Sequence, residues 1–235
     1  MVLTFLQNYP VIFAFLLGLI PALIWLWFWL KEDIHPEPAK MITLSFLGGM
    51  VAVMVALPFE KLVYSYTGDQ SVWSFALWGA IEEICKFVIV YFIALRSKST
   101  DEPMDDIIYL IISALGFVTF ENTLFLIPSI HSGDIVDTLV HSNLRFLGAS
   151  LLHVMSSATI GVCLAMSYYK PRSEKVFLTV FGVIIAITLH TCFNLFIISG
   201  TGANIFLTFG TVWFGIVVLL LLLERVKHIE VPKLT

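Results

Sequence analysis

Hydrophobic positions dominate the chain in long runs that short polar segments separate. A transmembrane helix needs about 20 consecutive apolar residues, and seven stretches come close to that length or exceed it. An outer-membrane barrel would instead show alternating segments of about 10 residues. The pattern therefore predicts an all-α polytopic membrane bundle that forms a single integral membrane domain over residues 1–235. The expected spans are 10–30, 41–59, 72–95, 107–128, 146–169, 176–198 and 204–223.

Two segments of the chain need separate interpretation. Segment 131–145 is polar enough to lie outside the lipid, yet its apolar residues recur with helical spacing, which predicts a short interfacial helix. The first apolar run has no basic residues before it, and Lys31 follows it. This is the reverse of the order in a cleavable signal peptide, so we expect the run to be retained as the first helix.

Composition agrees with a membrane protein and limits the partners. Hydrophobic residues make up 59% of the chain and charged residues only 13%, whereas soluble domains carry about 25% charged residues. The net charge of −4 comes without a basic patch, so we expect membrane lipid and no nucleic acid as a partner. The three cysteines, Cys85, Cys163 and Cys192, all lie in apolar runs, which argues against a disulfide framework.

The basic residues outside the spans fall mainly on one side of the expected topology. Ten of them lie in the first, third and fifth loops and the C-terminal tail: Lys31, Lys40, Arg96, Lys98, Lys170, Arg172, Lys175, Arg225, Lys227 and Lys233. Lys61 and Arg145 fall on the other side. Because cytoplasmic loops carry the excess of lysine and arginine, we expect the N-terminus outside and the C-terminus inside, in the cytoplasmic membrane of a bacterium or archaeon.

Six ionisable groups fall inside the expected spans, where such side chains are costly and usually functional. They are Glu82, Glu83, Lys86, Glu121, His153 and His190. At a rise of about 1.5 Å per residue, the two adjacent glutamates lie about 15 Å below the outer surface, and Glu121 and the histidines about 10–12 Å below it. Four helices thus deliver titratable groups to one layer, which predicts a joint site.

The residue types in this layer suit hydrolysis. Two histidines and one carboxylate form a usual catalytic zinc set, which leaves a fourth position open, and a further carboxylate can serve as general base for metal-bound water. Glu82 and Lys86 share a helix face at i,i+4 spacing and can pair, although such a pair can also be purely structural. Two further pairs share a face at the same spacing, namely His190 with Asn194 and His153 with Ser157.

At these residues the chain resembles the PrsW family of intramembrane metalloproteases, whose wider group includes CAAX-prenyl endopeptidases and bacteriocin-processing enzymes. The pattern Glu-Glu-x-x-Lys is met by Glu82-Glu83-Ile84-Cys85-Lys86, and Phe-x-x-x-Glu by Phe117-Val118-Thr119-Phe120-Glu121. His153 and His190 follow on two later helices. The resemblance covers residues 82–194. It implies a peptidase that cuts a single-span membrane protein near its extracytoplasmic side, and in the family the best-known such substrate is an anti-sigma factor.

The hypothesis of a protease assigns roles to seven residues. The catalytic groups are Glu82 or Glu83 as general base, Lys86 as the cation that keeps one carboxylate ionised, and Asn194 as donor to the developing oxyanion. Glu121, His153 and His190 are the expected ligands of a zinc ion. A water activated by glutamate without metal is the alternative.

Two other functions use the same residues. A proton-coupled transporter could employ the Glu/His cluster as a relay, but the sequence shows neither an inverted repeat nor paired broken helices. A haem carrier could use His153 and His190 as axial ligands, and colourless purified protein would exclude it. The sequence does not determine the substrate, the cleavage position or the oligomeric state.

Overall fold

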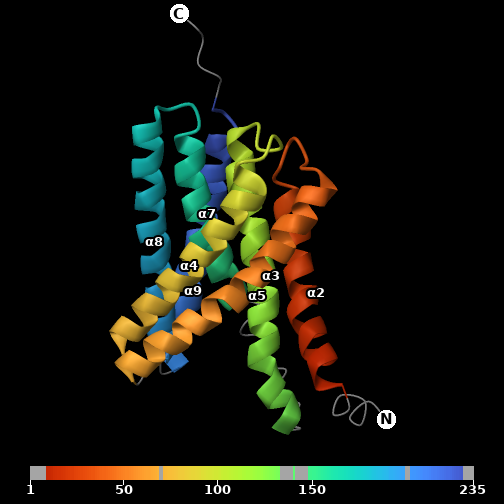
Figure 1. Ribbon diagram of the computed structural model, residues 1–235, viewed down its shortest axis with the longest axis vertical. Coiled ribbons are helices and arrows are strands. Elements are labelled where there is room, and N and C mark those ends of the chain that lie inside the picture. The colour runs from red at the N-terminus through yellow and green to blue at the C-terminus, as the bar shows by residue number, and fades with distance from the viewer. Residues whose placement is uncertain (1–8, 69–70, 133–139, 141–147, 199–201, 230–235) are drawn as a thin grey trace, which may run out of the picture.

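The computed structural model describes residues 9–68, 71–132, 140, 148–198 and 202–229, and these form a bundle of seven long helices (Figure 1). All seven expected spans are confirmed as helices. The helices are α2 (Pro10–Leu30), α3 (Ala39–Thr67), α4 (Val72–Val90), α5 (Pro103–Ser132), α7 (Ser150–Met166), α8 (Arg172–Ile198) and α9 (Gly202–Val226). A short π-helix, η1 (Tyr91–Leu95), extends α4.

The helix ends differ from the expected span ends where charged residues mark the edge of an apolar run. Helix α3 continues to Thr67, past Glu60 and Lys61, because a charge ends the apolar run but does not break helical hydrogen bonding. Helix α5 begins at Pro103, since proline suits the first helical position. The interfacial helix expected over 131–145 lies almost entirely outside the described residues.

Five of the helices are long and apolar enough to cross a membrane by length and composition, namely α2, α3, α5, α8 and α9. The other two carry residues of the expected site: α4 contains three charged residues, and α7 is an apolar helix of 17 residues. Successive helices run in opposite directions, so that α2 begins at one end of the bundle and α9 ends at the other (Figure 1). An odd number of spans accounts for this arrangement.

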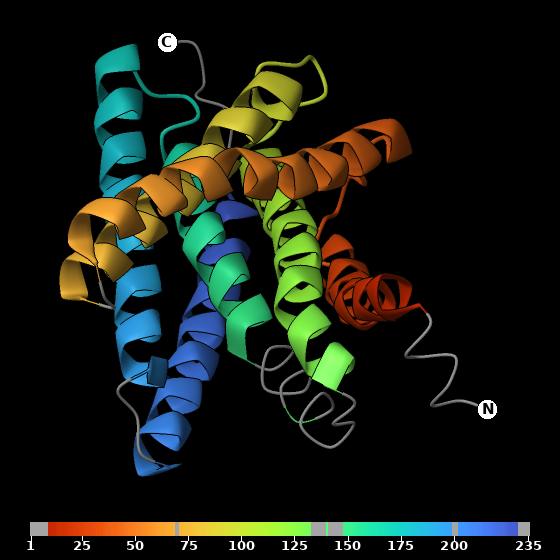
Figure 2. The ribbon, with the colours of Figure 1, turned by 60° about the horizontal axis from the view of Figure 1, so that its bottom comes forward.

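Helix α5 lies at the centre of the bundle and packs against α2, α3 and α7 (Figure 2). In its most apolar stretch 72% of the residues are buried, against 17% in α2. The α3–α5 crossing is close because both helices carry glycine there. A Cβ atom at Gly49 would lie 1.9 Å from the Ser113 carbonyl oxygen, and one at Gly116 would lie 1.9 Å from the Phe46 carbonyl oxygen. Small residues permit such backbone contact between membrane helices.

Helix α4 runs obliquely beside α3 and contacts α8 (Figure 1). The Ser71 hydroxyl caps its first turn by accepting a hydrogen bond from the Ser74 amide. Gly79 lies against the His190 ring, since a Cβ atom there would lie 3.5 Å from that ring. The oblique path thus carries the charged part of α4 to the histidines of α7 and α8.

Candidate active site

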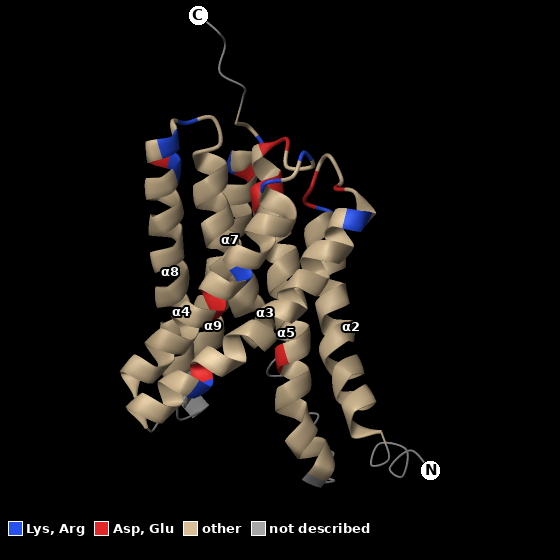
Figure 3. Cartoon of the chain, viewed as in Figure 1, with Lys and Arg blue, Asp and Glu red and all other residues tan. Residues whose placement is uncertain are grey.

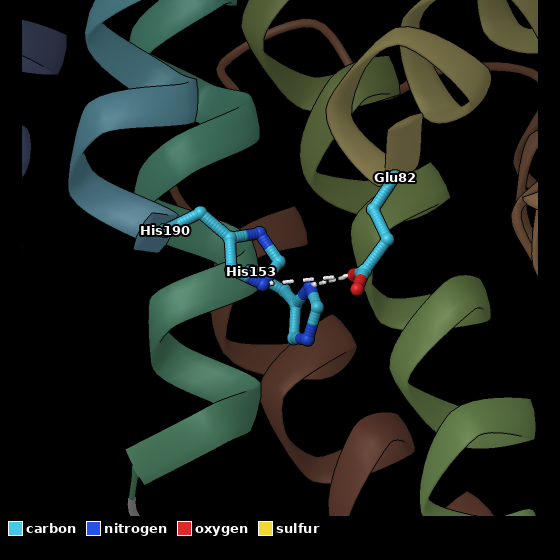
Figure 4. Close-up of side chains that lie close together, drawn as sticks. All are labelled: Glu82, His153 and His190. Atoms are coloured by element: carbon cyan, nitrogen blue, oxygen red, sulfur yellow. Dashed lines mark ion pairs between the residues drawn. The ribbon is translucent and has the colours of Figure 1, made fainter. Parts of the chain in front are cut away.

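Six ionisable side chains from four helices meet in the interior of the bundle. Glu82, Glu83 and Lys86 come from α4, Glu121 from α5, His153 from α7 and His190 from α8. Glu83 and Lys86 are completely buried, and each histidine is 2% exposed. The Glu121 side chain is 18% exposed and that of Glu82 10%. Figure 3 shows the few charges inside the bundle, and Figure 4 shows Glu82 pointing toward both histidines.

Glu83 is surrounded by hydrogen-bond donors. Its Oε1 lies 2.6 Å from Lys86 Nζ, 2.8 Å from the Ser156 hydroxyl and 2.9 Å from His190 Nδ1. Its Oε2 accepts a hydrogen bond of 3.1 Å from the Ser157 hydroxyl. Four donors on one buried carboxylate stabilise its ionised form. Glu83 is therefore suited to hold its neighbours in place.

The two imidazole rings each face one carboxylate with one nitrogen and Glu82 with the other. His190 Nδ1 bonds to Glu83, while its Nε2 lies 3.6 Å from Glu82 Oε2. His153 Nε2 lies 3.0 Å from Glu121 Oε2, while its Nδ1 lies 4.0 Å from Glu82 Oε2. The rings are perpendicular, with centroids 4.9 Å apart. This arrangement matches metal-binding histidines, which usually donate their second ring N–H to a carboxylate.

Lys86 defines the tautomer of His153. Its Nζ lies 3.0 Å from His153 Nδ1, and an ammonium group can only donate hydrogen bonds. His153 Nδ1 is therefore the acceptor nitrogen, and its proton is on Nε2, facing Glu121. An acceptor nitrogen is also the form that binds a metal, so an ion there would replace the hydrogen bond from Lys86 and leave the contact between Lys86 and Glu83.

A metal ion fits between Glu82, His153 and His190. Each of these residues offers one ligand atom, and within the described ranges they form the one group of three such residues whose ligand atoms all lie within 4.8 Å of one another. Glu82 Oε2 is buried and has no hydrogen-bond partner in the part of the chain that the structure describes. Ligands at about 2.0–2.1 Å from a tetrahedral zinc ion are about 3.4 Å apart. The distances of 3.6 and 4.0 Å from Glu82 Oε2 to the histidines come close to this value.

The geometry divides the residues differently from the sequence-based hypothesis. Lys86 pairs with Glu83 at i,i+3 rather than with Glu82 at i,i+4. The carboxylate that groups with the two histidines as a possible metal ligand is that of Glu82, not that of Glu121. Asn194, the expected oxyanion donor, lies one turn after His190. No described hydrogen bond joins it to the six ionisable side chains of the site. These differences arise because side-chain partners depend on which helices surround α4.

Two serines complete the site, and the sequence pointed to only one of them. The i,i+4 spacing from His153 points to Ser157 but not to Ser156. Both serines are fully buried and donate to Glu83. Ser156 also lies on the histidine's side of α7, at i,i+3, and its hydroxyl lies 3.2 Å from the His153 carbonyl oxygen. The signal in the sequence that could have identified both serines is their position three and four residues after a histidine within a span.

Comparison with known proteins gives the family. A family model described as PrsW family intramembrane metalloprotease matches residues 37–223, a range that contains every residue of the cluster. The chain belongs to the PrsW family. It is 32% identical over 150 residues to Protease PrsW of Halalkalibacterium halodurans, covering 63% of each chain, and 28% identical over 191 residues to Protease PrsW of Clostridioides difficile, covering 77% of each. No solved structure matches the chain.

The extent of these matches differs between relatives. The match to Protease PrsW of Geobacillus kaustophilus has 32% identity over 108 residues but covers only 47% of that protein. The chain thus spans about half to two thirds of the length of the first two relatives. Together, the apolar helices and the bacterial relatives make this PrsW family chain a multi-pass protein of a bacterial cell membrane.

Proposed function

We propose that this PrsW family chain is an intramembrane peptidase whose hydrolytic centre is built on Glu82, His153 and His190. One observation carries the proposal: among the described residues Glu82 Oε2 is buried without a hydrogen-bond partner, and it faces a nitrogen of each histidine. A buried carboxylate oxygen without a partner is unfavourable. A cation shared with the two imidazoles would compensate it.

Zinc is the metal we assign to this triad, because two histidines and one glutamate are a usual zinc set in peptidases. Bound zinc would supply a water whose pKa is lowered to near 7. Glu83 and Glu121 would orient the ligand histidines through the ring nitrogens that they face. Lys86 would keep Glu83 ionised through their 2.6 Å contact.

The general base in this proposal is Glu121. Both oxygens of Glu83 already accept hydrogen bonds, and Glu82 faces the histidines, whereas Glu121 is the most exposed of the three carboxylates. Glu121 would take one proton from the attacking water while the hydroxide adds to the peptide carbonyl carbon. It would then deliver that proton to the leaving amine as the C–N bond breaks. Asn194 as donor to the oxyanion stays a prediction.

The proposed substrate is a single-span membrane protein, with an anti-sigma factor as the candidate, cut near its extracytoplasmic side. The orientation behind this proposal comes from the basic residues. Most described lysines and arginines lie at the end of the bundle where α3, α5 and α8 begin (Figure 3). That end would be cytoplasmic by the positive-inside rule. Two of the basic residues on which the expected orientation rests, Arg145 and Lys233, lie outside the described residues.

The experiment compares Glu82→Gln with Glu121→Gln in purified protein, and measures zinc content together with cleavage of a co-reconstituted single-span anti-sigma factor. Glu82→Gln should lose zinc and cleavage together, because it removes a ligand. Glu121→Gln removes a carboxylate beside a ligand histidine, which weakens metal binding by about 10–100-fold, so excess zinc should restore occupancy. Cleavage should stay about 100-fold or more below wild type, since the base is missing.

Glu174→Gln is the matched control, because Glu174 is an exposed glutamate that pairs with Lys170 at the surface. It should keep full zinc content and cleavage. Full zinc content in Glu82→Gln would overturn the ligand assignment, and normal cleavage in both site variants would overturn the site. Wild-type protein that never cleaves but moves protons across the vesicle membrane would favour the transporter.

A further inference from the structure

Two buried acidic side chains join the connection between α2 and α3 to the start of α5. Glu37 of the connection is 8% exposed, and Asp105 of α5 is completely buried. We call these two residues the carboxyl pair. Figure 3 shows acidic residues gathered where the two segments meet. No described hydrogen bond or ion pair joins the carboxyl pair to the site on Glu82, so the pair is a separate feature of the molecule.

The contacts of the carboxyl pair require a proton between its two members. The side chains of Glu37 and Asp105 share a hydrogen bond, whereas two ionised carboxylates have only acceptor oxygens. One of the two groups must therefore donate. Asp105 Oδ2 already accepts hydrogen bonds of 2.8 Å from the backbone amides of Asp101 and Glu102. Asp105 is thus the acceptor of the pair, and Glu37 is the donor that carries the proton.

A proton on Glu37 also supplies a donor for an oxygen that otherwise lacks one. Asp105 Oδ1 is buried and has no donor among the backbone, amine and hydroxyl groups of the described residues. Glu37 Oε2 accepts a hydrogen bond from the Tyr109 hydroxyl of α5, which leaves the other Glu37 oxygen to carry the proton. Loss of this proton would place two like charges side by side in the interior, which is strongly unfavourable.

We propose that the carboxyl pair is a pH-dependent latch, which holds the α2–α3 connection on α5 while Glu37 is protonated and releases the connection when Glu37 ionises. The connection is the part that can move, because residues 31–38 lie between two helices, whereas α5 is packed between α2, α3 and α7. Release brings the ionised Glu37 carboxylate to water and away from Asp105. In the orientation that the basic residues favour, the latch responds to the pH of the cytoplasm.

The titration of Glu37 gives the pH range and the sign. Burial is the largest cause that raises the pKa of Glu37 to about 8, and the hydrogen bond with Asp105 is the next. In the released connection the carboxyl group is in water, where a glutamate has a pKa of about 4.3. Release therefore gives off one proton at any pH between these two values. The released fraction should rise with pH, by up to about 10-fold per unit, and level off above pH 8.

Three titratable groups face Glu37 from the elements packed against it. Asp105 and Tyr109 come from α5, and Asp33 comes from the connection itself. Burial, as the largest cause, raises the pKa of Asp33 to about 6. Most of the change in charge on Asp33 is therefore complete at pH 6.5, and measurements above that pH report mainly on Glu37.

The test is hydrogen–deuterium exchange of the purified full-length protein in detergent, measured by mass spectrometry over residues 31–40. The rates are corrected for the effect of pH on intrinsic amide exchange. From pH 6.5 to 7.5 the corrected exchange of the wild type should rise by about 3–10-fold. Glu37→Gln should show no rise, because the glutamine amide can donate to Asp105 and accept from Tyr109 at every pH.

Glu102→Gln is the matched control. It removes the carboxylate that pairs with the exposed His35 at 2.8 Å, and the charge of an imidazole can also change in this pH range. Glu102→Gln should keep the rise of the wild type. The proposal is overturned if the wild type shows no rise or if Glu37→Gln keeps it. Loss of the rise in Glu102→Gln would overturn it as well, because the pH dependence would then belong to His35.

A second variant of the carboxyl pair decides the question if Glu37→Gln does not fold. In Asp105→Asn the new side-chain amide can donate to Glu37, while its oxygen can still accept from the backbone amides. An ionised Glu37 then has a donor instead of a like charge beside it. The rise in exchange from pH 6.5 to 7.5 should therefore be absent from Asp105→Asn, and a rise equal to that of the wild type would contradict the latch.

Discussion

Substitution of Glu83 can distinguish a residue that stabilises the fold from one that acts as the general base. Its carboxylate and the Lys86 ammonium are both fully buried, 2.6 Å apart. Glu83→Gln keeps the size of the side chain but leaves the ammonium without a carboxylate, away from water. Removing one partner of a buried ion pair costs about 3–5 kcal/mol of the free energy of unfolding. For a chain of this size each 1 kcal/mol shifts the melting temperature by about 2–4 °C, so we expect a drop of about 6–20 °C.

The assay is thermal unfolding of the purified protein in detergent, followed by tryptophan fluorescence. The matched control is the double variant Glu83→Gln with Lys86→Met, which removes the unpaired charge and should recover much of the lost stability. The reasoning fails if Glu83→Gln melts at the wild-type temperature. Unchanged stability with a loss of cleavage of about 100-fold or more would instead indicate that Glu83 is the general base.

Three other expectations follow from the fold and the site. Gly116→Ala should lower the melting temperature, because its Cβ would lie 1.9 Å from the Phe46 carbonyl oxygen. Gly210→Ala should not, because no described atom lies within 4 Å of the added Cβ. Equal melting temperatures would contradict the close crossing. Tyr66→Cys, at an 83% exposed position, should react with a membrane-impermeant thiol reagent in intact cells; labelling only after permeabilisation would reverse the orientation. A chelator should abolish cleavage and zinc should restore it, whereas full cleavage in chelator would favour a water activated by glutamate alone.

The sequence by itself determined the helices and the composition of the site. Apolar runs of about 20 residues leave few alternatives to a transmembrane helix, so the seven spans could be placed from hydrophobicity alone. Charged groups in such runs are rare and usually functional, which identified Glu82, Glu83, Lys86 and Glu121 with the two histidines. Depth along each helix follows from the rise per residue, and it indicated that these groups lie in one layer.

The tertiary structure decided which of these groups face one another. The estimate of depth treats each helix as perpendicular to the membrane, but α4 runs obliquely (Figure 1), and its Glu82 carboxylate reaches both histidines despite the expected difference of about one turn. Lys86 lies near both glutamates on the same helix. It pairs with Glu83 because α7 and α8 direct Ser156, Ser157 and His190 at that carboxylate.

Two acidic residues of the connection between α2 and α3 show the same limit. In the sequence Asp33 and Glu37 are charges in a polar loop, a context that predicts exposure to solvent. In the structure both are buried, and Glu37 accepts a hydrogen bond from the Tyr109 hydroxyl, some 70 residues later in the chain. Hydrophobicity and local spacing predict which residues lie close to one another along the same helix. Contacts between distant segments depend on how the helices pack, and at the α3–α5 crossing that packing depends on two glycines that let the backbones touch.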